Sequence, residues 1–120
     1  YCWTAISGYS AFGSYTGNAS SDGPFVYTGF KPRYILIKPT TQGAPGYDWF
    51  IYDTARDTYN LTIKELEANL SITEDQYSAD IDILSNGFKV RNASVRNNES
   101  GATYIYAAFA ENPFKYANAR

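Results

Sequence analysis

The side chains that most often carry out catalysis are scarce in this chain of 120 residues, which has no histidine and a single cysteine, Cys2. Without histidine there is no Ser–His or Cys–His nucleophile pair, no histidine-containing zinc site and no imidazole base. One cysteine can form neither an internal disulfide nor a cysteine metal cluster, and beside Trp3 we expect it to be a small buried hydrophobic residue. The composition therefore favours a binding or structural domain over an enzyme, with no cofactor and no bound metal.

Two groups of acidic residues have the chemistry of a Ca²⁺ site or of a general acid–base pair. Asp80 and Asp82 are two residues apart on a predicted strand, so both carboxylates point the same way, and we interpret them as solvated charges on an outer face. Asp53, Asp57 and Asn60 cluster in one short segment, where a calcium loop would offer more oxygen ligands, and we interpret them as turn-forming residues. Carboxylate pairs of the glycosidase type depend on a separation in space, and no pair in the sequence is specific enough to predict one.

The aromatic residues are more informative, because twelve tyrosines exceed what the core of one small domain needs. Exposed tyrosine and tryptophan rings suit both sugar rings and protein partners. Tyr47, Trp49 and Tyr59 lie near predicted loops, and Asn60 could supply a planar amide to sugar hydroxyls. We take these four residues as candidate ligand-binding residues, with packing in the core as the alternative for each aromatic side chain.

Asparagine is followed two residues later by serine or threonine at Asn18, Asn60, Asn69, Asn92 and Asn98, more often than chance would give. In a eukaryotic secretory pathway these would be acceptor sites for glycosylation. We favour the simpler interpretation that these polar residues crowd the surface turns of a β protein.

The net charge of the chain argues against partners that are themselves strongly acidic. Ten basic and twelve acidic residues leave a net charge of −2, which argues against binding to nucleic acid or to an acidic lipid surface. No stretch of the sequence approaches the roughly 18 apolar residues that span a bilayer. We therefore expect neither a nucleic-acid partner nor membrane insertion.

Turn-forming residues are frequent and evenly spread along the chain, with short runs of period-two alternation between them. This pattern is typical of antiparallel strands. Residues 34–37 are apolar on both faces and predict a buried strand, and residues 48–53 predict a second strand joined to it by a hairpin connection over 40–46. Residues 103–109 alternate between two faces and predict a third.

The segment 80–92 contains the clearest local signal, an Asn-Gly pair at 86–87 that favours a type I′ turn because both central residues need positive φ. That turn places Ile83 opposite Val90. Turn chemistry and hydrophobic pattern then agree that the apolar residues share one face of the hairpin: Ile81, Ile83, Phe88 and Val90.

Residues 62–70 are compatible with two structures. Thr62 and Glu65 could form the capping box of a short helix, whereas Leu66, Ala68 and Leu70 alternate with Glu65, Glu67 and Asn69 as in a strand. The surrounding β pattern favours the strand.

Together these elements predict an all-β antiparallel sandwich of jelly-roll or lectin-like type with at most one short helix. We expect a single sandwich domain over residues 12–120, and residues 1–11 to be a lead-in segment or the closing strand of a preceding unit, because the chain starts in an apolar run. A sandwich of this length has sheet edges to protect, and association with identical neighbours is a common way to cover them.

Four blocks of the sequence, in order and at plausible spacing, resemble a repeat domain of tailed-phage virion proteins, mostly tail fibres and related structural proteins. They are FGSYTGNASSDGPFVYTGFKPRYILIK at 12–38, DWFIYDTARD at 48–57, ILSNGFKVR at 83–91 and TYIYAAFAENPFKYANAR at 103–120. The resemblance covers essentially the whole chain. It implies a location in the virion, partners among the other virion subunits, association into a homotrimer and no catalytic residue.

The resemblance leaves two functions open, with a third behind them. In the first, the domain belongs to a tail fibre or other appendage and contributes to host attachment by binding a surface glycan through loop aromatics and Asn or Asp side chains. In the second, it is a purely architectural domain whose tyrosine-rich surface meets other virion subunits. The third is a glycan-cleaving enzyme.

Overall fold

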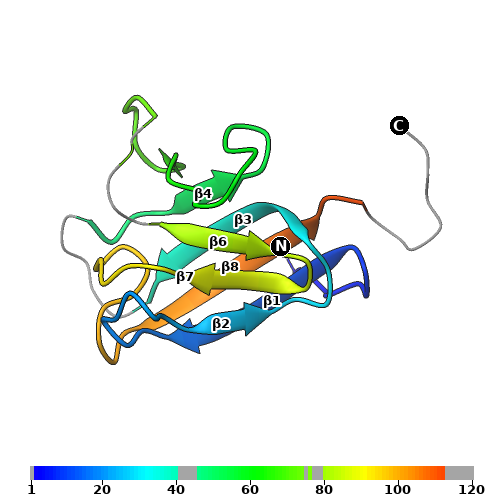
Figure 1. Ribbon diagram of the computed structural model, residues 1–120, viewed down its shortest axis with the longest axis horizontal. Helices are drawn as coiled ribbons and strands as arrows, with labels where there is room; N and C mark the ends of the chain where they lie inside the picture. The colour runs from blue at the N-terminus through cyan, green and yellow to red at the C-terminus, as the bar shows by residue number, and fades with distance from the viewer. Residues whose placement is uncertain (1, 41–45, 75, 77–79, 113–120) are drawn as a thin grey trace.

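The computed structural model describes residues 2–40, 46–74, 76 and 80–112 of the chain (Figure 1). These residues form strands and loops and contain no helix, so none of them belongs to a helix that could cross a membrane. The strands, in chain order, are β1 (Ser10–Thr16), β2 (Phe25–Tyr27), β3 (Pro32–Pro39), β4 (Phe50–Asp53), β5 (Leu66–Glu67), β6 (Ile81–Leu84), β7 (Gly87–Val90) and β8 (Thr103–Ala110).

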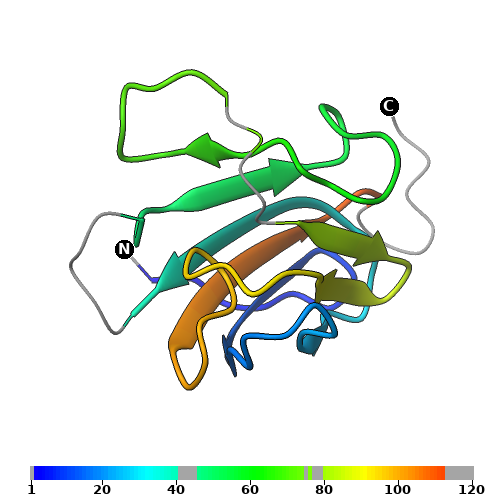
Figure 2. The ribbon, with the colours of Figure 1, turned by 60° about the vertical axis from the view of Figure 1, so that its left-hand side comes forward.

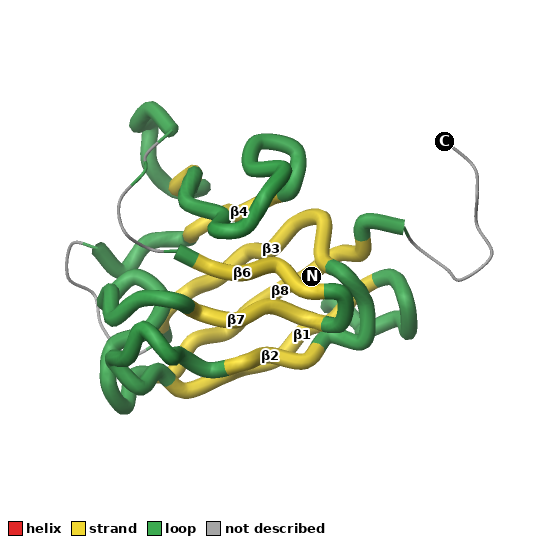
Figure 3. The backbone as a smooth tube through the Cα atoms, in the orientation of Figure 1, coloured by secondary structure: helices red, strands yellow, loops and turns green. Residues whose placement is uncertain are grey.

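The strands form two antiparallel sheets that lie face to face. The larger sheet has the order β1-β8-β3-β4-β5 and the smaller one the order β2-β7-β6. In Figure 1 the small sheet lies in front of the large one, and the rotated view in Figure 2 separates the two layers. Figure 3 shows how far the loops after β4 project beyond the sheets. The predicted all-β antiparallel sandwich is confirmed.

The core lies between the two sheets and consists of the inward-facing residues of both. Because side chains alternate along a strand, every second residue of β3, β4 and β8 enters this layer. Tyr15 stacks on Tyr104 with ring centroids 5.1 Å apart, so part of the tyrosine content serves packing. Burying one large apolar side chain contributes about 2 kcal/mol. The fully buried apolar residues are Ile35, Ile37, Phe50, Tyr52, Ile81, Phe88, Val90, Tyr104 and Ala108.

The three strands predicted around the large sheet are present. Residues 34–37 lie within β3, and residues 103–109 lie within β8. The second strand begins at Phe50 and pairs antiparallel with β3, with Ile35 opposite Tyr52, as the predicted hairpin requires. Residues 41–45 of the connection between them lie outside the described residues.

The hairpin of β6 and β7 has the predicted faces but a different register. Ile83 lies opposite Phe88 and Leu84 opposite Gly87, so the turn residues are Ser85 and Asn86. The prediction of a type I′ turn at 86–87 was wrong because Gly87 serves another purpose. A Cβ on Gly87 would lie 2.1 Å from the carbonyl oxygen of Val26, so glycine is needed for the close approach of β2. The register moved by two residues, which keeps the apolar side chains on the inner face.

Residues 62–70 contain no helix, and their one strand is β5 (Leu66–Glu67), so the predicted strand is confirmed for these two residues. The acidic residues face inward, because Glu65 and Glu67 are buried, whereas Leu66 and Leu70 are exposed. Thr62 makes an isolated bridge to Ile81 of the small sheet.

The N-terminal residues lie against the outer face of the large sheet. The ring of Trp3 stacks on Phe12 of β1 with centroids 6.5 Å apart. Cys2 is exposed, so the prediction of a buried cysteine was wrong. The segment that carries it lies outside the space between the sheets, where a small hydrophobic residue would be buried.

Candidate functional site

The four predicted binding residues are distributed over three places. Tyr59 and Asn60 line the same depression, which we call the polar hollow. Trp49 lines a separate depression on the outer face of the large sheet, which we call the apolar hollow. Tyr47 lines neither of them.

The polar hollow has a volume of about 190 Å³ and lies beside the loop that follows β4. The Tyr59 side chain stands beside it with 86% of its surface exposed. The hollow combines this ring with hydroxyl, carboxylate, amide and ammonium groups. Its lining residues are Lys31, Thr54, Asp57, Thr58, Tyr59, Asn60, Thr62 and Ile83.

The loop is held at its start by Asp53, the last residue of β4. One carboxylate oxygen of Asp53 accepts hydrogen bonds from the backbone N–H groups of Ala55 and Arg56, and the other pairs with Arg56 Nε at 2.6 Å. Desolvation opposes ionisation of Asp53, but the hydrogen bonds and charge of Arg56 outweigh it and lower the pKa of this carboxyl. Asp53 therefore forms the turn that the sequence predicted, in its ionised state.

Asp57 and Asn60 hold the rest of the loop. Asp57 Oδ2 accepts hydrogen bonds from the backbone N–H groups of Ile63 and Lys64, both at 2.7 Å. The Asn60 amide donates to the Ile83 carbonyl and accepts from the Ile83 N–H, both at 2.9 Å, as a neighbouring strand would. This confirms the turn-forming role of the acidic group and ties the loop to β6.

Several polar groups of the hollow remain available to a ligand. Within the described part of the chain, Asp57 Oδ1 and the Thr58 hydroxyl have no hydrogen-bond partner. Lys31 pairs with Glu111 at 2.8 Å, an exposed ion pair that a ligand can rearrange at little cost. A ring beside a free carboxylate oxygen and a hydroxyl offers both the apolar and the polar contacts that a sugar uses.

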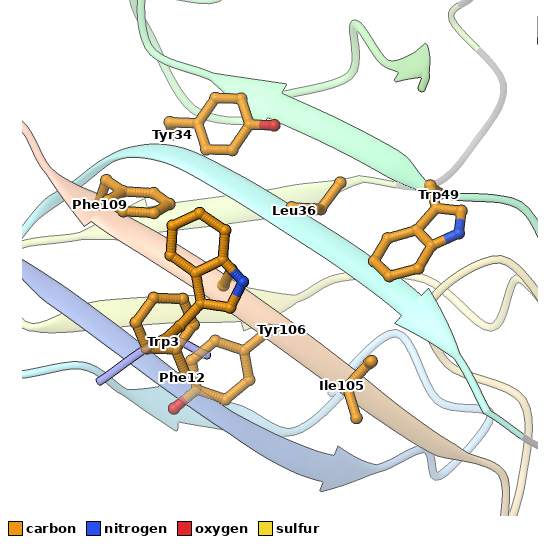
Figure 4. Close-up of a pocket in the computed structure, with 9 residues that line it drawn as sticks. Trp3, Phe12, Tyr34, Leu36, Trp49, Ile105, Tyr106 and Phe109 are labelled. Atoms are coloured by element: carbon orange, nitrogen blue, oxygen red, sulfur yellow. The ribbon is translucent and has the colours of Figure 1, made fainter. Parts of the chain in front are cut away.

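The apolar hollow is different in chemistry. It has a volume of about 360 Å³ and is open on the outer face of the large sheet, with Trp3 and Trp49 on either side of Leu36 in Figure 4. Among the described residues that line it, the polar side-chain atoms are limited to the indole nitrogens and two tyrosine hydroxyls, and none of these residues is charged. The lining residues are Trp3, Phe12, Tyr34, Leu36, Trp49, Ile105, Tyr106, Ala107 and Phe109.

Tyr47 is part of the scaffold. Its hydroxyl donates to Glu99 Oε2 at 2.8 Å, and its carbonyl accepts a hydrogen bond from Lys38 Nζ. The hydrogen bond to Glu99 is the main cause that raises the pKa of Tyr47. Its hydroxyl is thus already committed to the glutamate.

A buried cluster of charged residues beneath β4 and β5 was not predicted from the sequence. Arg96 Nη1 contacts the carboxylates of both Glu65 and Glu67, and the Tyr52 hydroxyl donates to Glu65 Oε2 at 3.0 Å. The Arg96 guanidinium also lies over the Phe50 ring, 5.3 Å from its centroid. Burial outweighs the attraction of Arg96 and raises the pKa of both glutamates. The two acids line neither hollow.

Asn98 shows that the Asn-x-Ser/Thr triplets are not all surface turns. Its side chain is buried, accepts from the backbone N–H of Asn18, and donates to Asn18 Oδ1, the Ser20 carbonyl and the Asn92 carbonyl. Asn98 therefore joins two loops and is inaccessible to modification in the folded chain. Among the described residues, no three acidic or cysteine side chains are grouped so as to hold a metal ion.

The sequence matches a family model over residues 1–113, which is nearly the whole chain. The family is described as "Domain of unknown function (DUF7483)", and the chain belongs to this family. Searches of the curated proteins and of the solved structures gave no match. The family description names no activity, substrate or partner.

Proposed function

We propose that this member of the DUF7483 family is a domain of a tailed-phage tail fibre or related virion appendage, and that it contributes to host attachment by binding a surface glycan in the polar hollow. The resemblance of four sequence blocks to virion repeat domains supports the setting. The chemistry of the hollow supports the ligand.

One observation carries the glycan proposal. Tyr59 presents an almost fully exposed side chain on the same hollow as Asp57, which keeps a carboxylate oxygen free among the described residues. The C–H face of a sugar ring stacks on an aromatic side chain, and its hydroxyls donate to a carboxylate oxygen. Because Asp57 and Asn60 fix the loop, these groups are positioned before the ligand binds, which lowers the entropy cost of binding.

The proposed activity is binding without turnover. A glycosidase of the common type needs two carboxyl groups on either side of the scissile bond. The buried acids Glu65 and Glu67 are held by Arg96 beneath the strands and line neither hollow. The glycan-cleaving alternative predicts release of new reducing ends from host polysaccharide, and we expect none.

A glycan array probed with the purified chain tests the proposal. We expect specific, saturable binding to a host-surface oligosaccharide, weakened about tenfold by Tyr59→Ala, which corresponds to about 1.4 kcal/mol. Tyr27→Ala is the matched control, because Tyr27 is also highly exposed but lies on the small sheet. An array without specific binding, or a Tyr59→Ala variant that binds like the parent, would count against glycan attachment.

A purely architectural role is the second candidate. It is favoured by the apolar hollow, whose lining resembles the centre of a protein interface more than a sugar site. In this role the domain contacts other virion subunits, and the resemblance implies a homotrimer. Size-exclusion chromatography with light scattering measures the assembly state directly.

A further inference from the structure

We propose that the outer face of the large sheet is an interface on which a second copy of this chain packs, face against face. By the outer face we mean the outward side chains of the five strands together with Trp3. The proposal does not depend on glycan binding.

The outer face is apolar through its centre. The strand registers place five residues opposite one another in a single row across the sheet: Phe12, Ala107, Leu36, Ile51 and Leu66. An antiparallel sheet that exposes one face to water normally alternates apolar inward and polar outward residues. A row of five apolar side chains is instead typical of a sheet that is covered on both sides.

The neighbouring rows complete the pattern of an interface. They add Phe109, Tyr34 and Ile105, and their charged members lie at the margin: Lys38 at one end and Asp53, paired with Arg56, at the other. An apolar centre with a polar rim is the usual anatomy of a protein–protein interface.

The outer face of the small sheet shows the contrast within the same molecule. There Lys89 pairs with Asp22 at 2.7 Å, and Arg91 pairs with Asp82 at 3.4 Å. These charged pairs are what a solvated sheet face requires. The two outer faces therefore have different environments, and only that of the large sheet lacks charge at its centre.

Both tryptophans of the chain lie on this face. The Trp3 side chain is 76% exposed and the Trp49 side chain 38% exposed. Figure 4 shows Trp3 over the β1 and β8 side of the hollow and Trp49 at its other side. Protruding aromatic residues beside a hollow are typical anchors of protein interfaces.

Three features favour a second copy as the occupant. First, the centre of the face is uncharged, so two identical faces do not repel each other and no charged partner is selected. Second, β1 is an edge strand of seven residues, SAFGSYT, without charge or proline, and such edges pair with other chains unless they are covered. A copy of the same chain can cover this edge and the adjoining face together.

The third feature is size. The long strands of the sheet have seven to eight residues and lie about 4.8 Å apart. Since β4 and β5 are shorter, the area of the face is roughly 500 Å² per copy. With the relief added by the two indoles, two apposed faces would remove about 1,200 Å² from water, the lower end of the range for stable, specific interfaces.

Sedimentation of the full chain over a range of concentrations, with tryptophan emission recorded in parallel, tests the proposal. We expect a reversible dimer whose tryptophan emission shifts to the blue as it forms, because two identical faces packed against each other close as a pair and both indoles of each copy enter the interface. A chain that stays monomeric with unchanged emission at high concentration would overturn the proposal, as would a monomer whose emission shifts only when another virion protein is added.

Charge placed at the centre of the face locates the interface. Leu36→Asp combined with Ile105→Asp should weaken association at least a hundredfold, while Tyr27→Asp on the small sheet should leave it unchanged. An oligomer that survives the double substitution in a folded chain would place the interface elsewhere. Should that variant not fold, the tryptophan emission of the unaltered chain still decides between the outcomes.

Discussion

At the scale of single residues, the buried charge cluster shows what local sequence pattern can and cannot predict. The alternation around Leu66 indicates correctly that Glu65 and Glu67 share a face. It does not indicate that this face is buried, because the side chain that makes burial tolerable, Arg96, is far away in the sequence. An acidic face turned inward is stable only with such a partner.

Removing that partner should be costly. We predict that Arg96→Met lowers the free energy of unfolding by about 3 kcal/mol, because two buried carboxylates lose their counter-charge. Arg91→Met is the control, since Arg91 forms a more exposed pair with Asp82 and should lose less than about 1 kcal/mol. Urea unfolding followed by fluorescence measures both, and equal losses would contradict the structural role of Arg96.

The same cluster predicts a pH dependence. Burial raises the pKa of Glu65 in the folded state above the ordinary value of a glutamate, about 4.3. The folded chain therefore binds the Glu65 proton more tightly than the unfolded chain, and protonated Glu65 adds to the free energy of unfolding. This contribution is fully present at a pH below the unfolded pKa, and it is lost as pH rises through the raised pKa of the folded state. Glu65→Gln cannot ionise, so its stability relative to the unaltered chain should improve as pH rises from 4 to neutral. A difference that is constant over this range in thermal unfolding would contradict the shift.

At the scale of elements, the β6–β7 hairpin separates what is local from what is not. Its inner face follows from the alternation of apolar residues, which survives a register change of two. Its register does not follow from the Asn-Gly pair, because Gly87 is required by the third strand, β2, which packs against it. A glycine in a turn motif is ambiguous until its neighbours in space are known.

Two substitutions distinguish the observed register from the predicted one. Gly87→Ala places a Cβ against the Val26 carbonyl oxygen and should lower the free energy of unfolding by about 2 kcal/mol or more. Asn86→Ala should change it by no more than about 0.5 kcal/mol, because Ala19 is the one described non-glycine residue with positive φ. In a type I′ turn at 86–87 the Asn86 substitution would also be costly, so a large loss in Asn86→Ala would contradict the observed turn.

At the scale of the whole molecule, the sandwich follows from short alternating runs and frequent turns, as predicted. The order of the strands in the sheets does not follow from this pattern, because β8 pairs with both β1 and β3, which are remote from it in sequence. The doubly apolar run at 34–37 predicts a strand buried on both faces. Its inner face meets the small sheet, and its outer face is the surface that we assign to a second copy.

The candidate site was predicted in part. Of the four candidate binding residues, Tyr59 and Asn60 line the polar hollow. Asp57 lines it too, although the sequence indicated only a turn-forming role for it. Trp49 and Tyr47 were selected by the same criteria but lie elsewhere, because residue type alone does not tell on which side of a sheet a loop aromatic emerges. Trp49 precedes β4 and lies on the outer face of the large sheet. The Tyr47 hydroxyl donates a hydrogen bond to Glu99.

The most direct test of the proposed attachment role is to map the bound ligand by NMR, titrating the ¹⁵N-labelled chain with the oligosaccharide that the array selects. We predict saturable shifts confined to the backbone amides of Thr58, Tyr59, Asn60 and their neighbours around the polar hollow. Shifts centred on Trp49 and Ile105 instead, or no saturable shift with any oligosaccharide of the host surface, would contradict glycan binding at this site.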